Sequence, residues 1–339
     1  MIEVGIIGLG KIASGYGSVD DPAPYTHAGG ILHSEKVSLV AVADFSEEAR
    51  GQFKEKWGRY FPETRAHDSL EGFLEGGVPD IVSICIRGPH HYGVLLRVIE
   101  AGPRAIFLEK PPTCSLEEMD GLRDAARLAG IPITVSYSRH WGPHVLRMAD
   151  LVREGLVGEV QRVTGYCGNA FLSFASHTTD MICQFAGYDP VAVYARGRVP
   201  EASVPENYEL EPHLETMLIE FESGRVGSQL ASQGAEGWFT CEVEGSDGRV
   251  RVPFYGKPVA WNKDGEELEL TGFPPNASPF TLAYDQIAQH LNGGPIPDCT
   301  DADFHAVHEV GFAGIESALT DRRVALPNTN RQRRVFANG

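Results

Sequence analysis

Long hydrophobic runs are missing from this sequence of 339 residues. No apolar stretch approaches the roughly 18 residues that a membrane-spanning helix requires, so we expect no such helix. The chain opens directly on a strand-like pattern, and we therefore expect no signal peptide and a cytoplasmic location. Hydrophobic and charged contents of 42% and 22% are typical of a globular protein that is long enough for two domains.

Basic charge is also scarce. The chain has 29 Lys and Arg residues against 46 Asp and Glu residues, which gives a formal net charge of −17. Such an excess of negative charge disfavours nucleic acid or an anionic membrane as a partner. The one basic cluster, formed by Arg331, Arg333 and Arg334, lies near the C-terminus, and we interpret it as a solvated terminus.

Closely spaced cysteines are absent, which excludes a zinc ribbon and disfavours disulfides. The six cysteines are Cys85, Cys114, Cys167, Cys183, Cys241 and Cys299, and we interpret several of them as small core residues. His305, His308 and Glu309 form an H-x-x-H-E pattern on a predicted helix. This pattern does not complete a three-ligand set, so we interpret these histidines as solvated or capping residues and expect no metal.

A glycine-rich turn follows the first apolar run of the chain. Val4–Ile7 leads directly into Gly8-x-Gly10-x-x-Ala13, as when a buried parallel strand enters a tight turn and then a helix. Gly8 would allow the turn, Gly10 would let the backbone approach a pyrophosphate, and Ala13 would let the helix pack closely. The helix N-terminus would offer N–H groups to the phosphates. We therefore predict dinucleotide binding rather than a plain strand–turn–helix, with contacts from Gly8, Gly10, Lys11, Ile12 and Ala13.

Short apolar runs alternate with longer amphipathic ones through the first half of the chain. The predicted strands are residues 3–7, 38–43, 81–86, 105–108 and 133–136, and the predicted helices include residues 47–57, 92–100 and 116–129. Such alternation is typical of a doubly wound parallel sheet of the Rossmann type. We assign residues 1–137 to this α/β domain.

Asp44 ends the second predicted strand, where an acid accepts hydrogen bonds from the adenosine ribose and repels a 2′-phosphate. Its distance from Gly10 exceeds the usual spacing of about 20 residues. We explain the excess by a loop, Gly15–Pro24, inserted into the first helix and placed to restrict substrate choice. The alternative role for Asp44 is a helix cap before Glu47. No arginine follows Asp44, so we expect NAD rather than NADP.

The second half of the chain has the period of two that is typical of strands. Residues 215–221 and 225–230 flank a turn and predict a hairpin, and residues 238–244 and 249–252 predict another. With residues 160–166 and 191–195 they predict a mostly antiparallel open sheet, followed by helices at 282–291 and 302–319. We assign residues 138–327 to this α+β domain and residues 328–339 to a tail.

Glu109, Lys110 and Pro111 follow the predicted strand 105–108. Open α/β sheets bind ligands at the carboxyl ends of their strands, where a partly desolvated lysine can donate to a substrate oxygen. The alternative is a solvated charged turn. Together with the glycine turn and Asp44, this motif resembles the Gfo/Idh/MocA family, named after glucose–fructose oxidoreductase and inositol dehydrogenase. The resemblance extends over nearly the whole chain, including His91, residues 137–143 and residues 151–160.

The resemblance implies an NAD(P)-dependent oxidoreductase that forms a homodimer or homotetramer through the second-domain sheet. It also implies that His91, Glu109 and Lys110 contribute to the cofactor site. The family places an aspartate four residues before a histidine on a helix, and His177 matches that histidine. Ser173 stands where the aspartate is expected, and Asp180 follows one turn later. Our hypothesis is that His177 takes the substrate proton while Lys110 polarises the carbinol oxygen.

Further polar residues could line the substrate pocket, although each alone is more often structural: His27, Arg139, Tyr166 and Asn169, with Ser173 and Asp180. The sequence as a whole indicates an NAD-dependent oxidoreductase. Its substrate would be a ring secondary alcohol, or the ketone, of a sugar, amino sugar or cyclitol derivative. One alternative is an enzyme that retains NAD during elimination or glycoside cleavage. Another is an idle NAD-binding regulatory protein, which the absence of the family's aspartate favours.

Overall fold

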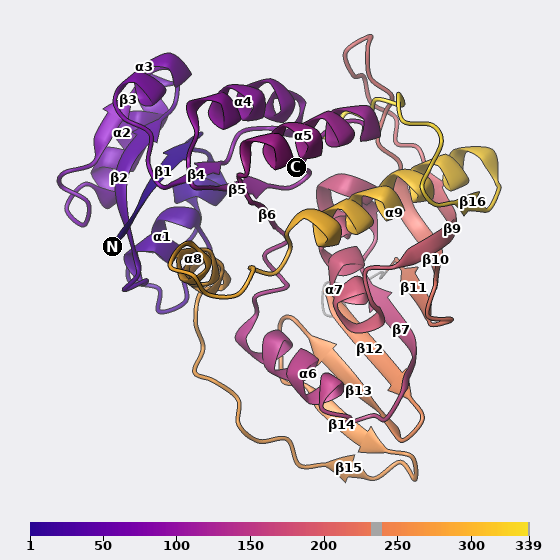
Figure 1. The fold of residues 1–339 in the computed structure, drawn as a ribbon. Helices are drawn as coiled ribbons and strands as arrows, with labels where there is room; N and C mark the ends of the chain where they lie inside the picture. Colours follow the sequence, from indigo (N-terminus) through magenta and orange to yellow (C-terminus); the bar gives the residue numbers. More distant parts are fainter. Residues whose placement is uncertain (232–238, 338–339) are drawn as a thin grey trace. The chain divides into compact units, whose positions relative to one another are not determined.

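The computed structural model describes residues 1–231 and 239–337. The chain forms two compact units (Figure 1). The first contains residues 1–113, 118–136 and 276–301, and the second contains residues 114–117, 137–275 and 302–339. The units differ from the predicted domains because residues 276–301 return to the first unit. In the part of the chain described, no helix is long and apolar enough to cross a membrane.

A six-stranded sheet forms the centre of the first unit, with the order β3-β2-β1-β4-β5-β6. Its strands are β1 (Ile2–Ile7), β2 (Val37–Ala43), β3 (Arg65–His67), β4 (Ile81–Ile84), β5 (Ala105–Glu109) and β6 (Ile133–Ser136). Every neighbouring pair is parallel, which confirms the predicted doubly wound sheet. The strand order reverses between β1 and β4, and ligands bind at such a switch point in open α/β sheets.

Helices follow the strands of the first unit; those at residues 47–57, 88–101 and 116–129 were predicted there, whereas the helix at 279–291 was predicted in the second domain. The helices are α1 (His27–Leu32), α2 (Glu47–Trp57), α3 (Leu70–Glu75), α4 (Gly88–Ala101), α5 (Leu116–Ala129) and α8 (Pro279–Leu291). Helix α8 packs against α1, where a Cβ on Gly30 would lie 2.4 Å from Cβ of Phe280. This close packing explains why residues 276–301 belong to the first unit.

The predicted insertion in the first helix is confirmed. A short π-helical turn, η1 (Lys11–Gly15), is separated from α1 by residues 16–26. Lys56 of α2 donates hydrogen bonds to the carbonyl oxygens of Gly15, Tyr16 and Gly17 at 3.0, 3.1 and 2.9 Å. The start of the inserted loop is therefore attached to α2.

A ten-stranded sheet forms the second unit, with β15-β14-β13-β12-β7-β11-β10-β9-β16 in order and β8 paired with β10. Its strands are β7 (Val160–Tyr166), β8 (Asn169–Ala170), β9 (Pro190–Arg198), β10 (His213–Phe221), β11 (Val226–Leu230), β12 (Thr240–Gly245), β13 (Gly248–Pro253), β14 (Val259–Asn262), β15 (Glu267–Leu268) and β16 (Val324–Ala325). The β7–β11 pair is parallel and the other described pairs are antiparallel, which confirms the predicted sheet. Trp238, the first residue of one predicted strand, lies outside the described residues.

Helices α6 (Pro143–Arg153), α7 (Ser176–Ala186) and α9 (Asp301–Thr320) pack on this sheet (Figure 1). A Cβ on Gly165 of β7 would lie 2.5 Å from the Thr178 methyl group, so glycine makes room for α7. Side chains of alternate strand residues point to the other face, where Leu218 and Leu230 are 41% and 38% exposed.

The C-terminal segment is packed against the second unit, so the prediction of a solvated basic terminus is wrong. Val335 is fully buried and its N–H donates to the carbonyl oxygen of Cys114 at 2.9 Å. Arg331 forms an ion pair with Glu309 of α9. Acidic residues elsewhere in this unit therefore hold the basic segment in place.

Two of the predicted roles for core residues have clear outcomes. All six cysteines are buried and none forms a disulfide among the described residues, which confirms the interpretation of several of them as core residues. His308 is 1% exposed and packs against Phe312 at a ring distance of 4.9 Å, so its predicted solvated role is wrong. The buried side of α9 accounts for this difference, because the local H-x-x-H-E pattern does not reveal which face is covered.

Candidate active site

The glycine turn of the first unit has the geometry of a dinucleotide site. Gly8 has a φ of +90°, and a Cβ there would lie 2.8 Å from the carbonyl oxygen of Cys85. Gly10 differs, because apart from its own residue and its chain neighbours no atom of the described residues lies within 4 Å of a Cβ placed on it. Ala13 is fully buried. The turn is thus tight at Gly8 and open at Gly10, as an approaching pyrophosphate requires.

Asp44 is joined directly to this turn. Its carboxylate oxygens accept hydrogen bonds from the N–H groups of Leu9 at 2.7 Å and Ser46 at 2.9 Å. Ser46, not Asp44, caps α2, because the Ser46 hydroxyl accepts from the N–H of Ala49. The alternative role of Asp44 as the cap of this helix is therefore wrong. Each carboxylate oxygen keeps acceptor capacity for a ribose hydroxyl.

Glu109 ends β5 and belongs to a buried chain of polar side chains. Glu109 Oε1 lies 3.0 Å from His27 Nε2, and His27 Nδ1 lies 2.8 Å from the Tyr284 hydroxyl. The Tyr284 hydroxyl lies 2.7 Å from that of Ser83. Glu109 is 5% exposed, and the other three are fully buried. His27, predicted to contact substrate, instead lies in the interior of the first unit.

The pKa shifts of Glu109 and Tyr284 indicate which group donates in each of these hydrogen bonds. Burial acts to raise the pKa of Glu109, but hydrogen bonding and charge from His27, together with the charge of Lys110, lower it below its ordinary value. Burial raises the pKa of Tyr284 well above its ordinary value, so Tyr284 stays a phenol that donates. In neutral His27, Nε2–H then donates to Glu109 while Nδ1 accepts from Tyr284. These hydrogen bonds hold Glu109, the residue directly before Lys110, in place.

His91 supports the same region from α4. It is fully buried, with Nδ1 2.8 Å from the carbonyl oxygen of Pro111 and Nε2 2.9 Å from that of Ile86. Burial lowers its pKa. His91 thus connects the chain segments that follow β4 and β5, and its contribution to cofactor binding stays a prediction.

In the second unit, His177 lies at the start of α7 and is 3% exposed. Its Nε2 is 3.0 Å from Nη1 of Arg139. A guanidinium group can only donate, so Nε2 accepts and the proton of neutral His177 lies on Nδ1. The Arg139 guanidinium is 4.1 Å from the ring centroid of Phe239, which favours its position by a cation–π interaction. The structure thus brings together two of the predicted site residues.

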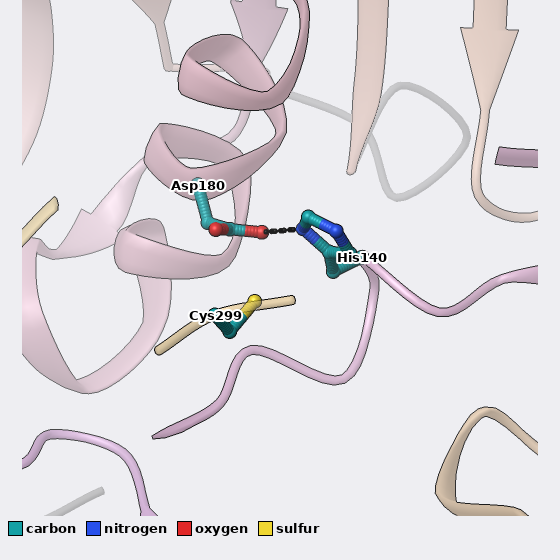
Figure 2. A group of neighbouring side chains, drawn as sticks. All are labelled: His140, Asp180 and Cys299. Carbon is teal, nitrogen blue, oxygen red and sulfur yellow. Dashed lines mark hydrogen bonds and ion pairs between the residues drawn. The ribbon is translucent and has the colours of Figure 1, made fainter. Parts of the chain in front are cut away.

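Asp180 lies further along α7 and is fully buried. One carboxylate oxygen lies 3.0 Å from His140 Nδ1, and the other accepts from the Tyr188 hydroxyl at 3.1 Å. Figure 2 shows this carboxylate directed at His140; Cys299, also drawn there, belongs to the first unit. Asp180 therefore has protein partners on both oxygens, and its predicted contact with substrate stays a prediction.

Tyr166 and Asn169 do not join His177. Gly165 faces α7, so the next residue, Tyr166, points to the other face of the sheet, where its hydroxyl donates to Glu242 at 3.2 Å. Asn169 is exposed with a φ of +74°, and its side-chain oxygen accepts from the N–H of Ala170 at 2.8 Å. Both side chains have structural partners, as the alternative interpretation of single polar residues expected.

Ser173 is not on a regular α-helix with His177. It lies in η2 (Phe171–Ala175), a π-helical turn that precedes α7. Ser173 is half-buried, and its hydroxyl donates to Oε2 of Glu211, a carboxylate that is 7% exposed. Sequence reasoning missed Glu211, because it comes 38 residues after Ser173 and no local spacing connects the two.

Comparison with known proteins agrees with this architecture. The family model described as an oxidoreductase family with an NAD-binding Rossmann fold matches residues 2–137, and the GFO/IDH/MocA C-terminal domain matches residues 165–251. The chain is 24% identical over 269 residues to a myo-inositol 2-dehydrogenase of Thermotoga maritima, covering 74% of each protein. It is also 24% identical to the NAD(+)-dependent scyllo-inositol 2-dehydrogenase of Bacillus subtilis, covering 93% of this chain and 94% of the relative.

Among solved structures, the WlbA dehydrogenase of Bordetella pertussis in complex with NADH and UDP-GlcNAcA has the same fold. Its TM-score is 0.73 at 20% identity, with 96% of this chain and 99% of that one covered. The glycine turn, the anchored Glu109 and both domain matches lead to one conclusion: the chain belongs to the Gfo/Idh/MocA family of oxidoreductases.

Proposed function

We propose that this protein is an NAD-dependent dehydrogenase that interconverts a ring secondary alcohol and its ketone on a sugar, amino sugar or cyclitol derivative. The observation that carries the proposal is the buried anchoring of Glu109 directly before Lys110, at the strand end of a dinucleotide-binding sheet. The named activities of the relatives support the same substrate class. They include two inositol dehydrogenases and a D-glucoside 3-dehydrogenase of Escherichia coli, which is 26% identical over 163 residues.

NAD is the proposed cofactor. Gly8, Gly10, Lys11, Ile12 and Ala13 would hold the pyrophosphate, and Asp44 would hold the adenosine ribose. The Asp44 carboxylate would repel the 2′-phosphate of NADP, and the next residue, Phe45, carries no charge to compensate. Replacing Asp44 with serine would reduce the preference for NAD over NADP, measured as the ratio of the two values of kcat/KM.

Alcohol oxidation requires the removal of a hydride and a proton from the same carbinol group. Bound NAD supplies the hydride acceptor. Lys110 would donate a hydrogen bond to the carbinol oxygen and stabilise the charge that develops on it. His177 would accept the proton at Nε2, the nitrogen that already acts as an acceptor.

Arg139 has a supporting role in this mechanism. Its hydrogen bond occupies His177 Nε2, so the guanidinium must move aside before His177 takes a proton. Until then, the bond holds the Nδ1–H tautomer and the ring orientation. Asp180 would support the same end of α7 through His140 and Tyr188.

Steady-state NADH formation with a panel of inositols, methyl glucosides and amino sugars tests the proposal. The expected result is sustained growth of absorbance at 340 nm with at least one substrate. Turnover without net NADH would instead indicate a retained cofactor, as in elimination or glycoside cleavage. NAD binding without any turnover would indicate a regulatory protein. The latter class has a named relative, the regulatory protein GAL80 of Saccharomyces cerevisiae, 25% identical over 103 residues.

Assembly and location remain predictions from the sequence. We propose a homodimer or homotetramer formed through the face of the second-unit sheet that carries Leu218 and Leu230. Light scattering of the wild type and of a Leu218→Glu variant would test this. The assembly should weaken in the variant. A cytoplasmic location stays an expectation.

A further inference from the structure

The inserted loop leaves the first helix of the first unit very short. η1 (Lys11–Gly15) is a single π-helical turn, and α1 begins only at His27. The last carbonyl oxygens of a helix have no partners inside it, so other groups must satisfy them. Here the carbonyl oxygens of residues 14–17 accept hydrogen bonds from two neighbouring side chains near the end of α2, Lys56 and Trp57.

Lys56 binds three of these carbonyl oxygens. Its ammonium group donates to Gly15 at 3.0 Å, to Tyr16 at 3.1 Å and to Gly17 at 2.9 Å. An ammonium group has three donors, so each of them is directed at the backbone of the segment that follows the glycine turn. A positive charge also lies favourably at the C-terminal end of a helix. Lys56 therefore acts on this segment as a backbone support.

Trp57 binds the fourth carbonyl oxygen and connects α2 with the glycine turn itself. Its indole N–H donates to the carbonyl oxygen of Ser14 at 2.9 Å, and the side chain is 1% exposed. The N–H of Ser14 donates to the carbonyl oxygen of Gly10 at 3.1 Å, and the Ser14 hydroxyl donates to that of Leu9 at 3.4 Å. Hydrogen bonds thus lead from α2 through Ser14 to Gly10, the open position of the turn.

We infer that Lys56 and Trp57 are positioning residues for the cofactor, because they hold the interrupted first helix so that the glycine turn stays shaped for a pyrophosphate. Gly10 has no side chain, so its approach to a pyrophosphate depends on backbone conformation alone. If the following segment were free, binding would have to order it, and that ordering reduces affinity. The inference rests on the proposed binding of NAD at this turn and assigns no contact between Lys56 and NAD.

Three variants separate this role from general support of the fold. Lys56→Met removes the three donors and keeps a long unbranched side chain beside the Trp57 ring. Lys54→Met is the matched control, because it makes the same change at an exposed position of the same helix. Trp57→Phe removes the indole N–H and keeps an aromatic ring, so it tests the contact with Ser14 separately.

The readout is the dissociation constant of NAD and of adenosine, measured by calorimetry. Adenosine lacks the pyrophosphate but keeps the ribose that Asp44 would hold. We expect Lys56→Met to weaken NAD binding by about tenfold and adenosine binding by less than about twofold. Trp57→Phe should also weaken NAD more than adenosine, and Lys54→Met should change neither.

Hydrogen exchange without any ligand tests the same inference in the free protein. The N–H groups of Ser14 and Tyr16 donate to the carbonyl oxygens of Gly10 and Lys11 within the short helix. They should exchange faster in Lys56→Met than in the wild type, because loss of the ammonium group loosens this turn. Lys54→Met should leave their exchange unchanged. Unchanged exchange in Lys56→Met would contradict the inference.

Two outcomes of the binding experiment would overturn the inference. NAD affinity in Lys56→Met equal to that of the wild type would show that the contacts support the loop alone. Equal weakening of NAD and adenosine would show a loss that is not specific to the pyrophosphate. If the wild type binds no NAD, the proposed function fails and this inference fails with it. That result is distinguishable, because the first two outcomes require a wild type that binds NAD.

Discussion

Two buried glutamates of this protein are held in different ways. Glu109 receives its hydrogen bond from His27, at the end of a chain of fully buried side chains in the first unit. Glu211 receives its hydrogen bonds from backbone N–H groups and from Ser173, which is half-buried. The comparison indicates that the first unit holds its buried carboxylate through other buried side chains, whereas the second unit holds its buried carboxylate through the backbone and a half-buried hydroxyl group.

Lys110→Ala gives the largest expected effect, because it removes the group that Glu109 supports. We expect kcat/KM for the best polyol to fall by about 10²–10³-fold, the usual loss when a donor that stabilises charge on a reacting oxygen is removed. The affinity for NAD, measured by fluorescence titration, should change far less. Lys54→Ala, at an exposed position of α2, is the control. Near-normal turnover in Lys110→Ala would contradict the assigned role.

His27→Ala tests the buried side of the comparison. It removes the hydrogen bond that His27 donates to the buried Glu109 carboxylate, and a buried charged acceptor that loses its donor costs more than the roughly 1–3 kcal/mol of a neutral one. Denaturant unfolding should show a loss of this size, whereas His33→Ala at an exposed position should change little. A loss in His27→Ala no larger than that of the control would show that the pair contributes nothing to stability.

Tyr284→Phe is a smaller change in the same series of hydrogen-bonded side chains. It removes the hydroxyl that lies between His27 and Ser83, so one buried acceptor and one buried donor lose their partner. The free energy of unfolding should fall by about 1–3 kcal/mol. If thermal and denaturant unfolding both leave Tyr284→Phe as stable as the wild type, the chain of hydrogen bonds is not a stabilising element.

His308 is buried like His27, and burial changes the pKa of its side chain. Burial, followed by the charges of His305 and Arg331, lowers the pKa of His308 from 6.5 to about 3. Below pH 6.5 the unfolded chain binds a proton that the folded chain does not, so stability falls as the pH decreases towards 3. The expected slope from this group is about 1.4 kcal/mol per pH unit.

His308→Gln isolates that contribution. Unfolding measured at pH 6 and pH 5 should show a shallower loss in the variant than in the wild type. Glu109 changes the stability little between pH 6 and pH 5. Its pKa is lowered in the folded state, so the stability that it contributes is lost only as the pH falls below the ordinary value of 4.5. Parallel pH curves for variant and wild type would contradict the assignment to His308.

The same comparison shows what the sequence could and could not predict. Strands β1, β2, β5 and β6 were predicted within one residue at each end, because buried parallel strands are continuous apolar runs. The edge strand β3 is three polar or small residues long and carries no such signal. Local patterns reveal strand ends and turns, which is why Asp44 and Lys110 were recognised as candidates.

Long-range partners were not predictable in this way. Tyr284 and Glu211 reach His27 and Ser173 across 257 and 38 residues, and neither belongs to a local motif. Burial of His308 depends on which face of α9 is covered, which the helix sequence alone does not state. The predicted helix across Ser173 and His177 contains a π-helical turn, so the expected i, i+4 geometry does not hold there.

Hydride transfer from substrate to released cofactor tests the central claim most directly. The substrate is the best inositol or glucoside of the panel, with deuterium at the carbon that is oxidised, and the NADH is analysed by mass spectrometry. We predict one deuterium in each NADH, formed in equal amount to the ketone. Substrate consumption without deuterated NADH, or NAD binding without any consumption, would contradict the account.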